Sequence, residues 1–389
     1  MDEKSLTPSA IIVGAGPVGV LLALTLDQLG WQVTLLEKHP LTGGLPPSYD
    51  HRQIALTAGS VDWLRQQPWT SELIQVLTPI HRIHSSSQGN FGILTMTHEE
   101  MEVDALGYTL SQAQLGEHLF TELATRNITC IGNIQLSQLH QTAQQVHLAW
   151  RTATGDCQGQ QADYLFAADG AHSWIRSALN IPTQDIHYPH ALMTAVAQLS
   201  APHHHQAIER FTAQGPSALL PMTDPYQAKV VYCYPNELSD EMQQLTDCEL
   251  TDCVNQQLGH QLGRISHLSA IAHYPLKEIR AQQIQVKRCL LVGNAAHTQH
   301  PVAGQGLNLG IRDVIAVSDW AENPNLLSWQ TLSKQRTQDH QQTMNFTHGL
   351  IQLFAHKRPL VRQVASLGMS LLSALPPIKR RITRMAMGY

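Results

Sequence analysis

The chain has 389 residues, which is long for one domain and short for three, and 43% of them are hydrophobic, enough to bury a large core. The formal net charge is −5, and the basic residues of the C-terminal region, residues 340–389, are few and lack interleaved aromatic residues, which argues against a nucleic-acid-binding protein. The six cysteines show no C-x-x-C pair or zinc-ligand spacing, which indicates reduced thiols and no metal site, and no stretch approaches the ~20 apolar residues that would cross a bilayer.

The first expected unit is a strand, turn, helix and second strand near the N-terminus. Residues 10–13 are apolar and precede Gly14-Ala15-Gly16-Pro17-Val18-Gly19, a helical pattern over residues 20–29 and a second apolar run over residues 32–37. This context makes the G-x-G-x-x-G pattern credible, because its glycines permit a tight turn and a close approach to a pyrophosphate at the helix N-terminus. The acid at the end of the second strand would bind a ribose. The predicted dinucleotide contacts are Gly14, Gly16, Gly19, Glu37 and Lys38.

A basic residue follows in Asp50-His51-Arg52-Gln53-Ile54-Ala55-Leu56. The guanidinium of Arg52 can counter the negative charge of a bound cofactor, although a surface arginine on a loop is the alternative. Residues 83–96 are expected to form strands and residues 111–124 a helix.

A second glycine-containing motif follows the apolar run of residues 164–168. It reads Asp169-Gly170-Ala171-His172-Ser173-Trp174-Ile175-Arg176, and Asp169 and Gly170 are its candidate cofactor contacts. An aspartate before a glycine at the end of a strand is also common in turns. Asp169 alone is therefore compatible with either a cofactor contact or a structural turn.

The middle of the chain is expected to be rich in strands. Apolar runs over residues 192–199, 207–211, 217–222 and 229–234 are separated by turn-forming residues such as Gly215-Pro216 and Asp224-Pro225. Residues 237–261 are predicted to be helical.

The most informative segment runs from Gly293 to Gly310 and reads Gly-Asn-Ala-Ala-His-Thr-Gln-His-Pro-Val-Ala-Gly-Gln-Gly-Leu-Asn-Leu-Gly. An apolar run over residues 288–292 precedes it and a helical pattern over residues 307–320 ends it, so the order is strand, glycine-rich loop and helix. The helix N-terminus would stabilise negative charge on a bound cofactor, whereas the simpler alternative is an ordinary strand–loop–helix joint. His297 is expected to be structural. The candidate cofactor contacts are Gly293, Asn294, Pro301, Gly304, Gln305, Gly306, Leu307 and Asn308.

Together these motifs resemble those of the FAD-dependent aromatic hydroxylases, in which the last segment usually opens Gly-Asp-Ala-Ala-His and continues Pro-x-x-Gly-Gln-Gly. Asn294 in place of that aspartate, and the segment Ala105-Leu106-Gly107-Tyr108-Thr109-Leu110, resemble one branch, the 2-polyprenyl-6-methoxyphenol hydroxylases of ubiquinone biosynthesis. The resemblance spans nearly the whole chain. It implies a para-hydroxybenzoate-hydroxylase-like α/β fold, with a Rossmann-like FAD-binding domain interleaved with a β-sheet substrate domain, and a helical C-terminal tail.

The expected domain limits follow from the positions of the motifs. Residues 1–80, 100–182 and 284–335 are assigned to the discontinuous FAD-binding domain, residues 81–99 and 183–283 to the substrate domain, and residues 336–389 to a basic helical region.

The resemblance further implies FAD as cofactor, NAD(P)H as reductant, and insertion of an oxygen atom from O2 into the ring of a polyprenylated methoxyphenol. The flavin carries that chemistry, so no catalytic side chain is expected. A second G-x-G-x-x-G unit is missing from the sequence, which fits a reductant that binds transiently.

The C-terminal region differs in charge from the rest of the chain. Seven of the 25 basic residues and none of the 30 acidic residues lie within residues 340–389, among many apolar residues. This combination suits a membrane surface or an acidic partner, and a helical tail packed on the main domain is the alternative. The expected location is cytoplasmic, with peripheral contact to the inner membrane and membership of a ubiquinone-biosynthesis complex as further hypotheses.

Three other functions remain open from the sequence. The chain could be a monooxygenase acting at another ring position or on a soluble phenol, or a flavin-binding assembly subunit with little turnover. A flavin dehydrogenase or halogenase is the third, although the W-x-W-x-I-P pattern typical of a halogenase is not found.

Overall fold

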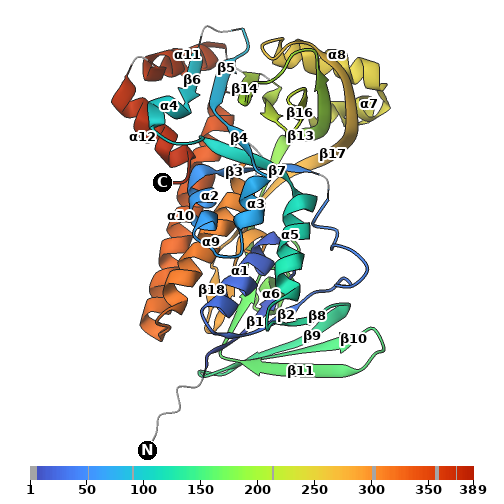
Figure 1. Ribbon diagram of the computed structural model, residues 1–389, viewed down its shortest axis with the longest axis vertical. Helices are drawn as coiled ribbons and strands as arrows, with labels where there is room; N and C mark the ends of the chain where they lie inside the picture. Colours follow the sequence, from blue (N-terminus) through green and yellow to red (C-terminus); the bar gives the residue numbers. More distant parts are fainter. Residues whose placement is uncertain are drawn as a thin grey trace, which may run out of the picture.

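The computed structural model describes residues 7–50, 52–89, 92–212, 214–299, 304–354, 359–373 and 375–389. Two large sheets lie toward opposite ends of the long axis of the molecule, as Figure 1 shows, and a small three-stranded sheet lies between them. The C-terminal helices run along one side of both.

The six-stranded sheet is built around the strand that precedes the first glycine motif. β1 pairs in parallel with β12 on one side and with β2 on the other. These strands read as unbroken apolar runs because successive residues, such as Ile11 and Ile12, are buried on both faces of the sheet. The sheet has the order β18 (Gln285–Val286), β19 (Cys289–Leu291), β12 (Tyr164–Ala167), β1 (Ser9–Val13), β2 (Gln32–Leu36), β8 (Thr129–Ile131).

Two helices that follow the glycine motifs pack closely together on this sheet. They are α1 (Pro17–Gln28) and α9 (Gln305–Ala321). A Cβ atom on Gly310 would lie 2.5 Å from Cγ2 of Val18, so the two backbones approach at a position where only glycine fits. The close approach brings the two glycine loops to the same edge of the sheet. The other helices of this half are α5 (Gln112–Ala124) and α6 (Trp174–Ala178).

The eight-stranded sheet is mostly antiparallel and has its own core. Met193, Val230 and Leu268 on its strands pack with Val254 and Leu258 of the helix α8 (Asp247–Leu258). Its order is β20 (His297–Thr298), β17 (Ile265–Ala281), β13 (Thr183–Leu199), β16 (Gln227–Pro235), β15 (Gly215–Pro221), β14 (Gln206–Thr212), β5 (Arg82–Ser87), β6 (Ile93–Thr97).

The remaining strands form two small sheets, and short helices connect the larger elements. One sheet has the order β3 (Gln53–Thr57), β7 (Gly107–Ser111), β4 (Thr78–Ile80), and the other β11 (Cys157–Ala162), β10 (Val146–Thr152), β9 (Ile134–Gln141). The short helices are α2 (Ala58–Arg65), α3 (Ser71–Gln75), α4 (His98–Met101), η1 (Asn236–Leu238), α7 (Ser239–Gln244), α8 (Asp247–Leu258) and η2 (Gly293–Ala295).

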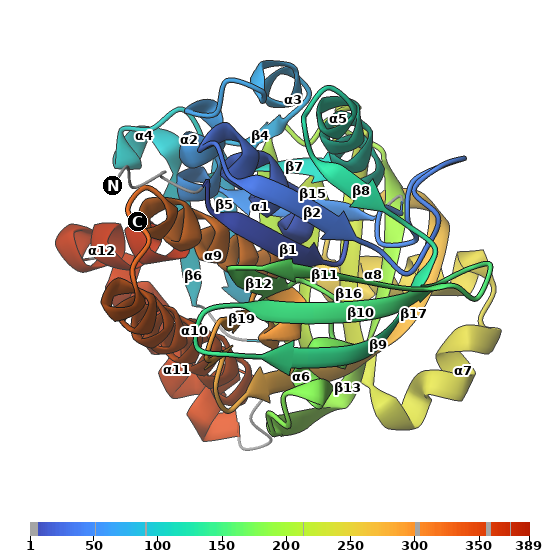
Figure 2. The ribbon, with the colours of Figure 1, turned by 90° about the horizontal axis from the view of Figure 1, so that it is seen from below.

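Three helices complete the chain: α10 (Leu326–Phe354), α11 (Pro359–Ser373) and α12 (Pro376–Ala386). Figure 2 shows α10 and α11 at one side of the molecule, beyond the edge of the six-stranded sheet. Within the described residues, no helix is both long and apolar enough to cross a membrane. The last residues return to the body of the protein, because the carbonyl of Met387 accepts a hydrogen bond from the backbone of Gly59.

The predicted α/β class is confirmed, and the elements differ from the prediction mainly at their limits. The helix predicted over residues 237–261 is divided into α7 and α8, because Leu245 is extended and Thr246 begins a new helix with a capping box to Glu249. β13 begins nine residues earlier than expected, at Thr183. The exact limits of the two domains remain a prediction.

Candidate functional site

One cavity of about 1100 Å³ lies between the two large sheets. Residues from the glycine motifs line one arm of it, and mostly apolar residues of the eight-stranded sheet line the other. Most of the predicted cofactor contacts are brought together on the first arm. They are Gly14, Gly16, Glu37, Lys38, Arg52, Asp169, Gly170, Asn294, Gly304, Gln305, Gly306, Leu307 and Asn308.

Three predicted contacts are not part of this lining. Gly19 and Gly293 lie behind it, and Pro301 lies outside the described residues. Gly19 keeps α1 close to the preceding turn, since a Cβ atom there would lie 1.9 Å from the carbonyl oxygen of Gly14. Gly293 has a φ of +54° and packs against Val18. Both glycines therefore shape the loops behind the site.

Gly14 and Gly16 differ in what surrounds them. A Cβ atom on Gly14 would lie 2.4 Å from the carbonyl oxygen of Ala168, at a φ of +103°. A Cβ atom on Gly16 would meet only Oγ of Ser48, at 3.9 Å, and would enter the cavity. Gly14 is thus needed for the fold, whereas Gly16 keeps space free for a ligand.

Two carboxylates stand at the ends of β2 and β12. Glu37 accepts hydrogen bonds from the backbone N–H groups of Ala15 (2.7 Å) and His39 (3.0 Å). Oδ2 of Asp169 accepts one from the backbone of Ile175, and its buried Oδ1 has no partner among the described residues. Burial raises the pKa of Asp169, although hydrogen bonds from Ser173 and from the backbone oppose the shift. An orphaned acceptor in this position is ready for a hydroxyl group of a ligand.

The loop between β19 and α9 contributes polar groups of two kinds. Asn294 is exposed toward the cavity, and both side-chain amide atoms of Gln299 are buried without a partner among the described residues. In contrast, the amide of Asn308 is fully used, because it donates to the carbonyls of Ala55 and Gly304 and accepts from the backbone of Thr57. Asn308 therefore fixes the start of α9, and Asn294 and Gln299 remain available to a ligand.

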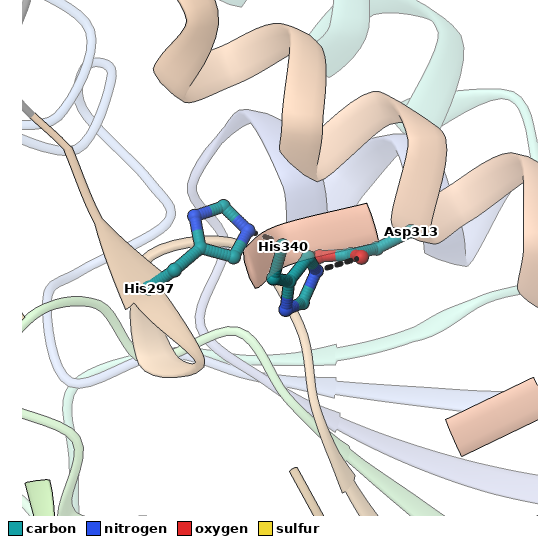
Figure 3. A group of neighbouring side chains, drawn as sticks. All are labelled: His297, Asp313 and His340. Carbon is teal, nitrogen blue, oxygen red and sulfur yellow. Dashed lines mark hydrogen bonds and ion pairs between the residues drawn. The ribbon is translucent and has the colours of Figure 1, made fainter. Parts of the chain in front are cut away.

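A buried charged cluster lies directly behind this loop (Figure 3). Asp313 of α9 accepts hydrogen bonds from the backbone N–H of Gly293 (2.9 Å), Nε of Arg336 (2.8 Å) and Nε2 of His340 (2.7 Å). Nε2 of His297 lies 3.4 Å from the same carboxylate. The cluster thus joins the cofactor loop to α9 and α10.

The acid and the two histidines have a geometry that could suit a metal ion. The guanidinium of Arg336 already contacts the Asp313 carboxylate, however, and a second cation there would be repelled. Burial alone would raise the pKa of Asp313, but the charges of His340 and Arg336 hold it well below its usual range. We therefore interpret the cluster as a structural anchor, in line with the structural role predicted for His297.

Acidification should destabilise the fold through His297. Burial, reinforced by His340, lowers the pKa of His297 from 6.5 to about 4. The unfolded chain therefore binds a proton that the folded chain excludes, so stability is present above pH 6.5 and is lost as the pH falls toward 4. Between pH 7 and pH 5 we expect a loss of about 2 kcal/mol in the free energy of unfolding from this group.

Urea unfolding at both pH values checks this expectation. His297→Gln serves as the matched variant because glutamine has a similar size and does not titrate. Its stability should change less with pH than that of the wild type. An equal pH dependence in the two proteins would contradict a buried neutral His297.

The second arm of the cavity is a mostly apolar surface. Its main residues are Ile80, Ile83, Met96, Leu106, Leu192, Leu220, Val231, Tyr274 and Leu276, and Ala386 at the end of α12 also lines the cavity. The guanidinium of Arg52 lies over the ring of Tyr274, with 5.6 Å between Cζ and the ring centroid. Because Tyr274 belongs to the apolar surface and Arg52 to the group of predicted cofactor contacts, Arg52 lies between the two parts of the cavity.

Several site residues were not predicted from the sequence. The sequence contains part of the information needed to find the charged cluster. An acid on an apolar helix face (Asp313) and two basic residues four apart on another helix (Arg336 and His340) are typical of a buried ion pair. Lys229 carries a similar signal as a charged residue within an apolar strand. Ala386 carries none, since only the packing of α12 brings it to the cavity.

Comparison with known proteins gives consistent results. A family model described as an FAD binding domain matches residues 7–320. The 3-demethoxyubiquinol 3-hydroxylase of Escherichia coli K12 is 27% identical to this chain, over 97% of each protein. The ubiquinone hydroxylase UbiM of Neisseria meningitidis is also 27% identical, over 99% of this chain and 85% of the relative.

Among solved structures, the p-nitrophenol 4-monooxygenase PnpA of Pseudomonas putida DLL-E4 is similar in fold. Its TM-score is 0.81 at 17% identity, with 98% of each chain covered. A likeness at this identity extends to the fold alone.

Proposed function

We propose that this chain, which belongs to the FAD binding domain family, is an FAD-dependent monooxygenase that hydroxylates the ring of a polyprenylated methoxyphenol in ubiquinone biosynthesis. One observation carries the proposal: a single cavity joins a cofactor arm built from the glycine motifs to an apolar arm large enough for an aromatic ring. The names of the two ubiquinone hydroxylases above support the choice of pathway.

The residues of the cofactor arm fit FAD. Gly16 and Gly306 leave open space where a Cβ atom would protrude, and Oδ1 of Asp169 and the amide of Gln299 lack partners. Glycine surfaces accept a pyrophosphate, and orphaned acceptors and donors accept the hydroxyls and ring edges of a flavin nucleotide. Asn294 can accept and donate hydrogen bonds but lacks the charge of an aspartate.

When bound, FAD supplies the redox and oxygen chemistry, with NAD(P)H as reductant and O2 as co-substrate. The side chains have the tasks of binding, orienting and excluding water. Asp169 and Glu37 would bind the sugar hydroxyls of FAD. The N-terminus of α9 would stabilise negative charge on the part of the cofactor next to this helix. The apolar arm would hold the ring and keep water away from the reacting atoms.

The pathway is tested by mass spectrometry of quinone intermediates in cells that lack the gene. The proposal predicts loss of ubiquinone and accumulation of a polyprenylated methoxyphenol, whose structure identifies the blocked ring position. Unchanged ubiquinone with no accumulated precursor would favour a soluble phenol as substrate.

A flavin-binding assembly subunit is distinguished by turnover. An enzyme should oxidise NAD(P)H faster when a phenol is added, whereas an assembly subunit should not respond. This measurement is made on the purified FAD-loaded protein and does not depend on the pathway.

We further propose that the C-terminal helices hold the protein at an anionic membrane surface. α11 and α12 pack on the protein, through Ser366 to Gly92 and through Lys379 to Glu100. They nevertheless expose apolar side chains, with Leu367 and Met385 64% and 60% exposed. Exposed basic residues accompany them on α12: Arg380, Arg381 and Arg384. Exposed apolar and basic groups on one helical surface are typical of interfacial binding.

Charge reversal on α12 tests this proposal. Arg381→Glu with Arg384→Glu should weaken sedimentation with phosphatidylglycerol vesicles by roughly tenfold or more, because each basic residue near such a surface contributes about 1 kcal/mol. Arg151→Glu with Arg264→Glu changes the net charge equally on other elements and should leave binding unchanged. Equal binding by both double variants would contradict the proposal. Deletion of the tail is a poorer test, because His340 and Ala386 contact the site.

A further inference from the structure

The strand register places two ionisable residues on the cavity face of the eight-stranded sheet. Glu209 of β14 lies opposite Ala218 of β15, and Lys229 of β16 lies opposite Leu220, two residues further along β15. Side chains two residues apart on a strand share a face, and all four of these residues line the cavity. The acid and the lysine are therefore neighbours on one wall, with apolar residues between them.

Lys229 is a buried cation without a partner. It is 4% exposed, and none of the described residues forms a hydrogen bond or ion pair with its ammonium group. Burial lowers the pKa of Lys229 to about 8, with Arg52 adding to the shift and Asp50 opposing it. An unpaired buried charge is costly, so a partner brought by the ligand would relieve a real penalty.

Glu209 also has few hydrogen-bond partners among the described residues. Its only hydrogen bond among the described residues is the long one from Oγ of Ser85, at 3.4 Å. Burial raises the pKa of Glu209 to about 7, and the bond from Ser85 opposes the shift. Close to neutral pH this group can donate or accept a hydrogen bond.

The spacing of the two residues follows from the strand register. Two strand separations across the sheet and a stagger of two residues place their Cα atoms roughly 12 Å apart. Both residues line the same cavity, and the carboxylate of Glu209 contacts Ser85 of β5, on the side of β14 away from Lys229. The other charged groups of this region are already engaged: Arg52 pairs with Asp50, and Lys277 with Asp185.

We propose that Lys229 binds the phenolic oxygen of the substrate as a phenolate and that Glu209 binds a second oxygen substituent of the same ring. This inference rests on the proposed function and assigns the two ring oxygens of its methoxyphenol substrate to two residues of one cavity wall. When a phenol binds the amine form of Lys229, its O–H bond breaks and an N–H bond forms, which leaves a phenolate and an ammonium group. The phenolate ring is richer in electrons and is more easily oxygenated.

The test uses 4-nitrophenol as a probe, because its phenolate absorbs visible light that its acid form does not. Difference spectra of the FAD-loaded protein give both the affinity for the probe and the pH at which the bound probe ionises. In the wild type the bound probe should ionise at a lower pH than the free probe. Lys229→Met should bind the phenolate about tenfold more weakly and ionise the bound probe at a pH at least one unit higher, whereas Lys229→Arg should retain phenolate binding.

Matched controls separate the specific effect from misfolding and from general charge. Lys277→Met removes another cavity lysine, one already paired with Asp185, and should leave probe ionisation unchanged. 4-Nitroanisole cannot ionise and should bind wild type and Lys229→Met equally. Glu209→Leu should lose the preference for 2-methoxyphenol over phenol. Retained FAD content shows that each variant is folded.

The binding measurement does not require turnover. A negative result for the phenolate site can therefore be distinguished from a failure of the proposed function. Weakened phenolate binding in Lys229→Met, with no hydroxylation by the wild type, would retain the phenolate site and reject the enzyme. Unchanged probe affinity and ionisation in Lys229→Met, or no binding of 4-nitrophenol to the wild type, would overturn the site even if hydroxylation occurs.

Discussion

Replacing Gly16 by valine should give a folded protein that carries little FAD. The backbone at Gly16 has φ −72° and ψ 175°, which any residue adopts, and a Cβ atom there would approach nothing closer than Oγ of Ser48, at 3.9 Å. The branched side chain would instead fill the cavity beside the start of α1, where the pyrophosphate is expected. We expect FAD affinity to fall by roughly a hundredfold or more, equivalent to about 2.7 kcal/mol. The flavin-to-protein absorbance ratio and an FAD titration measure it.

Two other glycines serve as controls for this result. Gly349→Val lies on the exposed side of α10, where a Cβ atom has open space, and should keep its FAD. Gly19→Ala should damage the fold itself, because its Cβ atom would lie 1.9 Å from the carbonyl oxygen of Gly14. Wild-type FAD content in Gly16→Val would show that the cofactor is bound elsewhere.

Replacing Asp313 by alanine should cause the largest loss of stability in this half of the protein. The substitution leaves the Arg336 side chain, which is 8% exposed, with its ion pair to Asp339 and a long hydrogen bond to the carbonyl of Leu309. Breaking a buried pair by removing one partner typically costs about 3–5 kcal/mol. The backbone N–H of Gly293 also loses its acceptor, so the cofactor loop should become less ordered and FAD affinity should fall as well.

Urea unfolding of the FAD-free protein measures the stability change. Asp319→Ala, an exposed acid on the same helix, is the matched control and should change stability by no more than about 0.5 kcal/mol. A loss below about 1 kcal/mol in Asp313→Ala would contradict the role of the cluster as an anchor.

The sequence predicted those parts of the site that depend on residues close together in the chain, such as the glycine motifs. The first motif is recognisable because its turn needs a backbone at Gly14 that only glycine readily adopts, and because the flanking strands are continuous apolar runs. The same holds for residues 293–310. The predicted α/β class and FAD as cofactor followed from these local patterns, and the fold and the family match agree with them.

The sequence did not predict what depends on distant pairing. Lys229 faces the cavity because the register of β15 and β16 turns it inward, and that register is set by the whole sheet. His340 joins Asp313 only because α10 packs against α9, and Ala386 reaches the cavity only because α12 returns to β3 and α2. These contacts join residues far apart in the chain, where periodicity carries no information.

The central claim is that one cavity holds FAD beside an aromatic ring and that oxygen from O2 is transferred to this ring. The most direct measurement supplies the FAD-loaded protein with NAD(P)H, a short-chain prenylated methoxyphenol and isotopically heavy O2, and analyses the product by mass spectrometry. The proposed function predicts a product with one added hydroxyl group that carries the heavy isotope, formed in step with NAD(P)H oxidation. NAD(P)H oxidation that yields only hydrogen peroxide, or a product without the heavy isotope, would contradict it.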